Sequence, residues 1–434
     1  MNFSSHKTLN TEVSREKMVM ERNLLDIIST DGYTALIEGE PGQGKTTISL
    51  AACALKGSCK YISYAEPEHS LKKKLLNIEK GEMAKLDVMS AVTGEPSRVF
   101  SEIISGLSEG KLVIVDSLDA LMYSLKDEGE MRSFLQILYG SSKQKKGSLL
   151  FISENVNPAS RHVRFICDAL VSLDSVEVLG SYVRRARVIK DRDYQIKNRF
   201  YYYAISDKLK IFTPSQVYQT QKMKALKTFK RPPEGVVDAE IALGYNILYD
   251  VDYSVSDLML KVFREALAAD YLRSGYSVDY WLGPQESEEE VIKSVRQLAG
   301  SNIDKLKTIY VDPQEFEYNS DEFLRNIVSA YGRDNAVDII HLLSQEDFAV
   351  KQPMEYERFV KNATKENLKL KRITILFGYS NQEALRIRAK YSNVLRKIII
   401  KDGFLFWRSL RPLGNVYLAD FKLEKGYVSF EEMF

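Results

Sequence analysis

The stretch GEPGQGKTT, from Gly39 to Thr47, decides how the rest of the chain is interpreted. Before it stands TALIEGE, a short apolar segment typical of a buried strand, and after it KTTISLAACAL has the apolar spacing of a helix. Gly39, Gly42 and Gly44 allow backbone N–H groups to converge on an anion without Cβ clashes. Strand, glycine-rich turn and helix form the context in which a GxxxxGK[ST] match predicts a phosphate-binding P-loop.

Each position of this loop has an expected contact with a nucleotide. Lys45 can reach the β- and γ-phosphates, and the Thr46 hydroxyl can ligate Mg²⁺, while the helix that follows adds its N-terminal dipole. The sequence therefore predicts that ATP and Mg²⁺ bind here. The residues expected to contact the nucleotide are Gly39, Glu40, Pro41, Gly42, Gln43, Gly44, Lys45, Thr46 and Thr47.

A second magnesium ligand is expected downstream, in the segment KLVIVDSLDAL. Its apolar run, Leu112–Val115, ends in Asp116, which places that carboxylate at the carboxyl end of a central strand. We therefore predict Asp116 as the carboxylate of the magnesium site. Asp119 is expected to lie in the first turn of a helix.

Hydrolysis needs a base that orients water, and CKYISYAEPEHSL supplies two acids after a predicted strand. Glu66 falls at the strand end, beside the expected γ-phosphate, and Glu68 is its competitor. An acid at a strand end is also commonly just solvated. We predict Glu66 as the catalytic base.

The strand SLLFISEN follows, and after it the segments CDALVSL, RRARVIKDRD and YYYAISDKLKIF have the β-branched and aromatic content of strands. With GEPGQGKTT, VIVDSLDAL and YAEPEHSL, these segments resemble the RecA-like ATPases, and among them the KaiC-like branch of archaea and the cyanobacterial clock. The resemblance covers most of residues 20–215. The GvpD-like gas vesicle regulators of archaea are also similar.

The resemblance implies a role for Lys190 and Arg192. KaiC-like proteins end their core with a strand that has a Lys-x-Arg pair, and the two cations reach the nucleotide site of the neighbouring subunit. Two departures make ATP binding a firmer expectation than hydrolysis: Ala65-Glu66 stands in place of paired glutamates, and Asp193 in place of a glycine. The surrounding basic stretch also fits a solvated strand face or a nucleic-acid patch.

The second half repeats the order of elements of the first half, which predicts an α/β fold with two tandem RecA-like domains. The expected domains are residues 1–215 and 236–434, with a polar linker over residues 216–235 that ends near Pro-Pro. The counterpart of the P-loop is DVDYSVSDL, which has neither glycine nor lysine. Glu66 falls opposite Gly283 and Asp116 near His341, so the second domain is predicted to be a degenerate pseudo-ATPase.

Composition limits the remaining classes of function. The chain has 434 residues, 44% hydrophobic and 28% charged, with no apolar run long enough to cross a membrane and a polar N-terminal segment, so we expect a cytoplasmic protein. The net charge of +2 provides no overall attraction to nucleic acid. The three cysteines are expected to be reduced thiols, and the four scattered histidines form no zinc motif.

These observations favour an ATP-binding regulatory switch that hydrolyses ATP slowly, self-associates or binds a protein partner, and has no membrane role. One alternative is a DNA recombination or repair ATPase, for which the candidate DNA-binding loop is YGSSKQKKGS, Tyr139 to Ser148. Another is an autophosphorylating phosphotransferase, since KaiC-like proteins can phosphorylate themselves.

Overall fold

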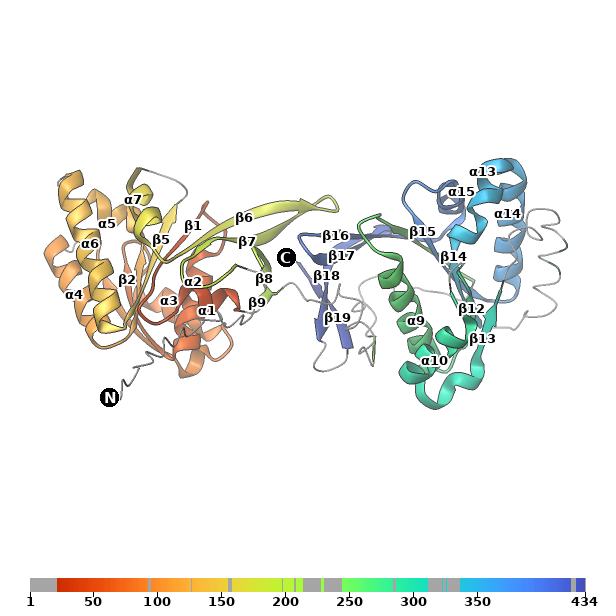
Figure 1. Cartoon of the computed structure of the whole chain (residues 1–434), viewed down its shortest axis with the longest axis horizontal. Coiled ribbons are helices and arrows are strands. Elements are labelled where there is room, and N and C mark those ends of the chain that lie inside the picture. The colour runs from red at the N-terminus through yellow and green to blue at the C-terminus, as the bar shows by residue number, and fades with distance from the viewer. Residues whose placement is uncertain are drawn as a thin grey trace, which may run out of the picture. The chain divides into compact units, whose positions relative to one another are not determined.

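The structure, a computed structural model, describes residues 22–92, 95–125, 127–154, 158–196, 198–206, 208–213, 228–229, 244–283, 286–310, 322, 325, 336–422 and 427–433. The chain divides into two compact units (Figure 1). The first unit comprises residues 1–174, 185–201 and 205–211, and the second comprises 175–184, 202–204 and 212–434. Of the linker expected over residues 216–235, only the short strand β10, Thr228–Phe229, lies within the described residues.

The first sheet has nine strands in the order β3-β2-β4-β5-β1-β6-β7-β8-β9. The strand β1 lies between β5 and β6 and is parallel to both. The bounds are β1 Thr34–Gly39, β2 Ser58–Ser63, β3 Lys85–Ser90, β4 Leu112–Asp116, β5 Ser148–Glu154, β6 Ala169–Val178, β7 Ser181–Asp191, β8 Phe200–Ile205 and β9 Leu209–Phe212.

Helices connect the parallel strands of the first unit and cover its sheet. Because β1, β4 and β5 are buried nearly throughout, their sequences are continuous apolar runs, as parallel strands covered on both faces require. The helices are α1 Leu24–Ile28, α2 Lys45–Lys56, α3 Glu68–Leu76, α4 Pro96–Ser108, α5 Leu118–Tyr123, α6 Glu128–Lys145 and α7 Pro158–Ile166. One face packs Leu36, Val113 and Phe151 against Leu107 of α4 and Leu138 of α6.

The second sheet has ten strands in the order β10-β19-β18-β17-β16-β11-β15-β14-β12-β13. From β13 to β19, this order matches the first sheet strand for strand, with β11 in the place of β1. The strands are β11 Asn246–Val251, β12 Ser277–Trp281, β13 Leu306–Ile309, β14 Ala336–His341, β15 Ile373–Tyr379, β16 Val394–Lys401, β17 Phe404–Arg411, β18 Leu413–Lys422 and β19 Tyr427–Glu432. The prediction of two tandem RecA-like α/β domains is therefore confirmed.

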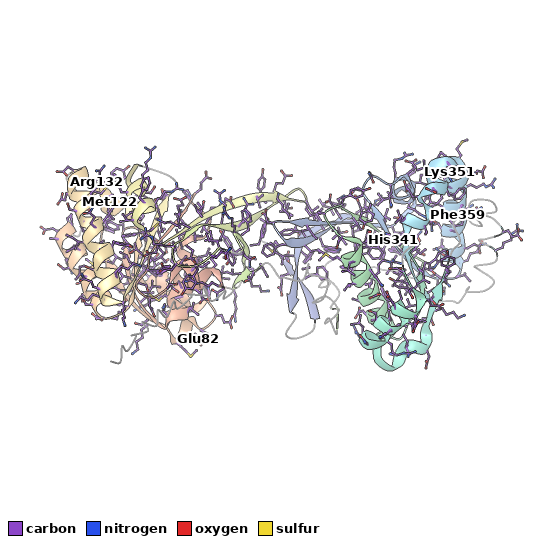
Figure 2. The ribbon with its side chains drawn as sticks, viewed as in Figure 1. Glu82, Met122, Arg132, His341, Lys351 and Phe359 are labelled. Atoms are coloured by element: carbon purple, nitrogen blue, oxygen red, sulfur yellow. A yellow bond between two sulfur atoms is a disulfide. The ribbon has the colours of Figure 1, made fainter. Side chains whose placement is uncertain are left out.

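Helices also cover both faces of the second sheet. Alternate residues of β11 point to opposite faces: Tyr249 packs in a cluster with α9 and α10, whereas Leu248 packs in a cluster with α14. Figure 2 shows Phe359 of α14 and His341 at the end of β14. The helices are α9 Asp257–Arg273, α10 Glu288–Ala299, α13 Glu346–Lys351, α14 Pro353–Lys369 and α15 Glu383–Tyr391.

The strand registers relate single positions of the two sheets. Asp116 of β4 pairs with Ile152 of β5, and Gly39 at the end of β1 pairs with Glu154, two residues further along β5. In the second sheet, His341 of β14 pairs with Phe377 of β15, and Val251 at the end of β11 pairs with Tyr379, again two residues further along. Val251 therefore occupies the place of Gly39, and His341 occupies the place of Asp116.

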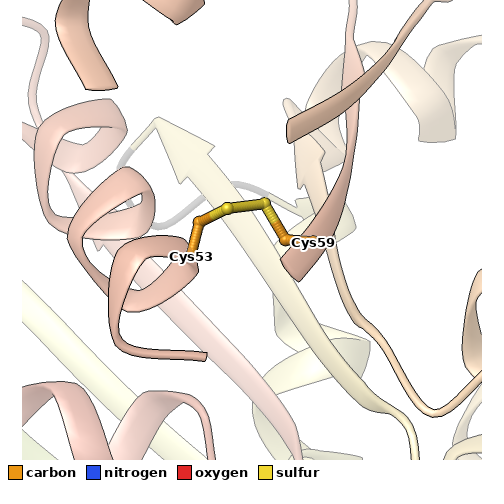
Figure 3. The surroundings of a disulfide bond; sticks show 2 residues. All are labelled: Cys53 and Cys59. Carbon is orange, nitrogen blue, oxygen red and sulfur yellow. A yellow bond between two sulfur atoms is a disulfide. The ribbon is translucent and has the colours of Figure 1, made fainter. Parts of the chain in front are cut away.

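The prediction of three reduced cysteines is wrong for two of them. Cys53 in α2 and Cys59 in β2 form a disulfide with a Cα–Cα distance of 5.4 Å (Figure 3), whereas Cys167 is a buried free thiol. Gly57 has a φ of 73° and turns the chain back from α2 into β2, which brings the two buried side chains together. Sequence spacing alone does not show this approach. Within the described residues, no helix is long and apolar enough to cross a membrane.

Candidate nucleotide site

The loop between β1 and α2 has the backbone of a phosphate cradle. Gly42 has a φ of 83° and Gly44 a φ of 81°, in the left-handed region that disfavours side chains. A Cβ atom at Gly39 would lie 2.7 Å from the carbonyl oxygen of Leu173, so only glycine fits there. Because Gly44 occupies the N-cap of α2 and has no side chain, it does not cap the first N–H groups of the helix. Those groups are available to an anion.

Lys45 lies across this loop. Its Nζ donates to the carbonyl oxygen of Gly39 at 2.6 Å and to that of Glu40 at 3.1 Å. Partial burial lowers the pKa of Lys45, and the carboxylates of Glu154, Asp116 and Asp119 oppose that shift. The amine is thus held at the mouth of the cradle, where it can exchange the loop carbonyls for phosphate oxygens.

Thr46 and Asp116 meet beneath the loop. The Thr46 hydroxyl donates to Oδ2 of Asp116 at 3.1 Å, and the Tyr61 hydroxyl donates to the same oxygen at 2.6 Å. Burial raises the pKa of Asp116, against the two hydrogen bonds, and it also raises the pKa of Tyr61 well above its usual value. Sequence reasoning missed Tyr61. Tyr61 lies two residues before Ser63, the β2 partner of Asp116, and alternate strand residues share a face, but this strand register is not visible in the sequence.

This oxygen cluster fits a magnesium ion that is bound together with a nucleotide. Among the described residues, no group of three His, Cys, Asp or Glu side chains could hold a metal by itself. Mg²⁺ ordinarily takes one or two protein oxygens and completes its shell with phosphates and waters. Thr46 and Asp116 supply two such oxygens beside the cradle, so the residues fit Mg²⁺ with a nucleoside triphosphate.

Glu66 follows β2, as expected, and its carboxylate is turned toward α3. Lys74 and Ser70 of α3 both donate to it, Ser70 at 3.1 Å, and its backbone N–H donates to Ser63 Oγ at 2.9 Å. It lies near enough to Asp116 to raise the pKa of that carboxyl. Action as a base requires that one carboxylate oxygen leave α3. The competitor, Glu68, pairs with Lys72 at 2.6 Å on the exposed side of the same helix.

Asp119 lies in the first turn of α5, as predicted. Its carboxylate accepts a hydrogen bond from Ser153 Oγ at 3.1 Å and one from the Glu154 N–H at 2.8 Å. These bonds tie the end of β4 to the end of β5. Asp119 is therefore a positioning residue at the edge of the candidate site.

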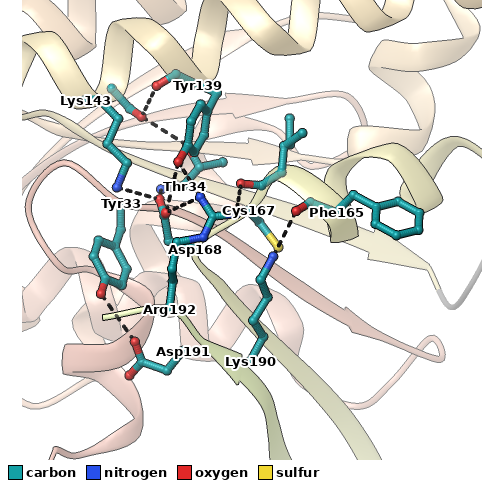
Figure 4. Close-up of polar contacts among 12 residues, drawn as sticks. Tyr33, Thr34, Tyr139, Lys143, Phe165, Cys167, Asp168, Lys190, Asp191 and Arg192 are labelled. Carbon is teal, nitrogen blue, oxygen red and sulfur yellow. Dashed lines mark hydrogen bonds and ion pairs between the residues drawn. The ribbon is translucent and has the colours of Figure 1, made fainter. Parts of the chain in front are cut away.

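Lys190 and Arg192 bind within the first unit (Figure 4). Lys190 Nζ donates to the carbonyl oxygens of Arg164 at 3.3 Å and Phe165 at 2.9 Å, at the C-terminal end of α7. Arg192 contacts the buried carboxylate of Asp168 at 3.3 Å and also donates to the Tyr139 hydroxyl. Both cations therefore have partners in their own unit.

Arg192 lies far from its own P-loop. Asp168 accepts the backbone N–H of Thr34, the first residue of β1, whereas the P-loop follows Gly39 at the other end. Five strand residues span about 16 Å. Contact of Arg192 with a nucleotide therefore needs the site of another subunit, and the inter-subunit role stays a prediction.

Arg185, another basic residue of β7, also has a partner within the protein. Arg185 bonds Asp174 at 2.8 Å and lies over the ring of Phe200. Lys197, which belongs to the same basic stretch, lies outside the described residues. The expected DNA-binding loop, Tyr139 to Ser148, is corrected by the structure: α6 extends to Lys145, and β5 begins at Ser148.

The equivalent loop of the second unit, residues 252–256, is not a cradle. No residue in it has a positive φ. The Ser256 hydroxyl accepts the N–H of Met259 and so caps α9. Both loops have five residues before the helix, so Asp257 holds the position of Lys45. A carboxylate there would repel a phosphate.

Comparison with known proteins adds one match. A family model described as "ATPase: KaiC" matches residues 25–216, the part of the chain that holds the P-loop, Asp116 and the Lys190–Arg192 pair. This region is thus a KaiC-like ATPase domain. A search of curated proteins finds no match. The likeness to GvpD-like regulators and to archaeal proteins stays a prediction.

Proposed function

We propose that this chain is an ATP-dependent switch whose nucleotide state is recognised by a protein partner. The proposal starts from the KaiC-like ATPase domain at residues 25–216. The observation that supports ATP and Mg²⁺ binding best is the hydrogen bond between Thr46 and Asp116 beneath a loop with two left-handed glycines. In a P-loop site, a hydroxyl and a carboxylate hold Mg²⁺, and the backbone N–H groups of a glycine-rich loop bind the phosphates.

Hydrolysis is proposed to be slow. The predicted base, Glu66, is bound by Lys74 and Ser70 of α3, so its carboxylate has to turn away from these partners before it can orient a water. Bound Mg²⁺ would neutralise charge on the phosphates. Lys45 would bind them from the loop side, and Thr46 and Asp116 would hold the ion in place.

A switch also suits a chain with one intact and one degenerate site. The second unit repeats the strand order of the first and lacks the cradle, so it offers a RecA-like surface without turnover of its own. Arg192 is bound to Asp168 at the end of β1 away from the P-loop, which favours self-association or a protein partner that brings it to another site.

A DNA recombination or repair ATPase is the second candidate, and it has less support. The stretch expected to form its DNA-binding loop is helical up to Lys145, and Arg185, Lys190 and Arg192 are engaged within the protein. An autophosphorylating phosphotransferase remains testable, because mass spectrometry after incubation with ATP would detect a phosphorylated chain.

Isothermal titration of the full chain with ATP and Mg²⁺ tests the proposal. We expect one site per chain and nearly no binding by Lys45→Ala, which removes the phosphate contact and no core packing. Lys56→Ala is the matched control, because Lys56 lies at the far end of the same helix and pairs with the exposed Asp31. Unchanged affinity in a folded Lys45→Ala variant would refute the nucleotide site.

Native mass spectrometry with and without ATP then tests the switch. We expect one nucleotide per chain and an assembly, or a complex with a partner, whose abundance depends on ATP. An unchanged assembly state together with normal ATP binding would leave an ATP-binding domain without the proposed switch.

A further inference from the structure

The second unit contains a cavity of about 380 Å³ at the place that corresponds to the nucleotide site. It lies beside the start of α9, the loop after β12 and the end of β14, at the carboxyl edge where α/β sheets bind ligands. Ligand pockets commonly have about 300–1,000 Å³, so this one suits a small molecule. The residues that line this second-unit pocket are Asp257, Leu258, Leu260, Lys261, Arg264, Gly283, Glu286, His341 and Leu343.

The charges of the second-unit pocket balance and are already engaged. Arg264 binds the Glu286 carboxylate at 3.0 and 3.1 Å, and Lys261 binds Glu290 at 3.1 Å. The Asp257 carboxylate accepts the hydroxyl of Tyr379. Two lining anions and two lining cations leave no net charge, so a charged ligand would have no free counter-charge and would have to break an existing pair.

His341 is the uncharged polar side chain among the lining residues. The residue is 7% exposed, and its Nε2 atom is buried without a hydrogen bond. Burial, followed by the nearby Arg264, lowers the pKa of His341 to about 3, so the imidazole is neutral at physiological pH. The other ring nitrogen, Nδ1, lies beside Gly283 of the pocket lining, and a hydroxyl or amide on a ligand can bond it in either tautomer of the ring.

We propose that the second-unit pocket binds a small uncharged organic molecule, with an apolar part against Leu258, Leu260 and Leu343 and a hydroxyl or amide group at the imidazole of His341. The site stands where an active RecA-like domain holds phosphates and magnesium, yet it has Asp257 in place of the lysine and His341 in place of the magnesium carboxylate. This proposal does not depend on ATP binding by the first unit.

Saturation-transfer NMR on the full chain tests this with three uncharged probes and their charged counterparts. The uncharged probes are nicotinamide, benzamide and thymidine, and the counterparts of matching shape are nicotinate, benzoate and thymidine monophosphate. We expect at least one uncharged probe to bind with a Kd between about 10 µM and 1 mM, and its charged counterpart to bind at least about tenfold more weakly. The signal should persist in Lys45→Ala, which separates this site from the nucleotide site.

Two variants assign the binding to the second-unit pocket. Leu343→Trp should fill the pocket and abolish the signal, and because Leu343 is 40% exposed the change leaves the core intact. His341→Phe should weaken binding about tenfold through loss of one hydrogen bond. Failure of all three uncharged probes, equal binding of the charged counterparts, or binding that survives in a folded Leu343→Trp variant would each overturn the proposal.

Discussion

Thr46 and Asp116 lie 70 residues apart in the sequence, and the Thr46 hydroxyl donates to the Asp116 carboxylate at 3.1 Å. The contact joins the first turn of α2 to the carboxyl end of β4. Because both oxygens suit Mg²⁺, this pair marks where the ion and the triphosphate are expected to meet.

Asp116→Asn should lower Mg²⁺-dependent ATP turnover by about 100-fold or more, since several kcal/mol of charge stabilisation depend on the ion. Binding of ATP in the presence of EDTA should change little. Steady-state phosphate release and titration with and without Mg²⁺ measure both effects. Asp119→Asn is the control from the same segment, and a larger loss in that variant would move the metal role to Asp119.

Glu66→Gln should keep ATP affinity and lower turnover by about 100-fold or more, the scale for the loss of a positioned base. Glu68→Gln should keep wild-type turnover, because its partner Lys72 and its exposure place it on the outer side of α3. Single-turnover hydrolysis with radiolabelled ATP measures both variants. Equal rates for Glu66→Gln and wild type would leave the site without this base.

Arg192→Ala should lower turnover by about 1,000-fold if Arg192 acts at the nucleotide of another subunit, as arginine fingers do. Because Lys143 pairs with Asp168 at 3.0 Å, the variant leaves that buried carboxylate with a cation. A mixture of Lys45→Ala and Arg192→Ala chains should regain activity, since each chain supplies the group that the other lacks. Arg185→Ala, whose partner is Asp174, should keep wild-type turnover. A mixture that stays inactive across a range of concentrations would exclude action between subunits.

Glu265→Gln should stabilise the protein at pH 8. Burial raises the pKa of Glu265 to about 7 from its ordinary 4.5. The unfolded chain therefore ionises from pH 4.5 upward while the folded chain stays protonated until about pH 7, and stability is lost as the pH rises through this window. The gain at pH 8 is at most about 3 kcal/mol and should vanish at pH 4.

Thermal unfolding of Glu265→Gln and wild type at pH 4 and pH 8 measures this difference. Glu290→Gln is the matched control, because Glu290 binds the same Lys261 but its side chain is 71% exposed. A melting temperature of Glu265→Gln that is no higher than that of wild type at pH 8 would show that the buried carboxyl is not destabilising.

Local sequence was enough for the parts of the site that adjoin each other in the chain. The glycines and Lys45 of the loop act through backbone conformation and the start of one helix, and Asp116 is fixed by the end of one apolar strand. The tandem RecA-like fold also followed from the repeated order of elements, because parallel strands with helical crossovers permit few arrangements.

Contacts between distant segments were beyond the sequence. Tyr61 reaches Asp116 across β2 and β4, Glu66 is drawn to Lys74, and Arg192 is bound to Asp168. Each depends on strand register and on which face a side chain occupies. The disulfide between Cys53 and Cys59 depends likewise on the turn at Gly57.

The sequence by itself determined that the first unit has a phosphate cradle and that the second unit lacks one, since glycine, lysine and their spacing set the local backbone and charge. Only the tertiary structure decided what replaced the cradle. His341, Arg264 and Glu286 come from separate elements, and strand pairing brings them around one cavity. Burial there keeps His341 neutral, because an imidazole away from water loses the hydration that stabilises its charged form.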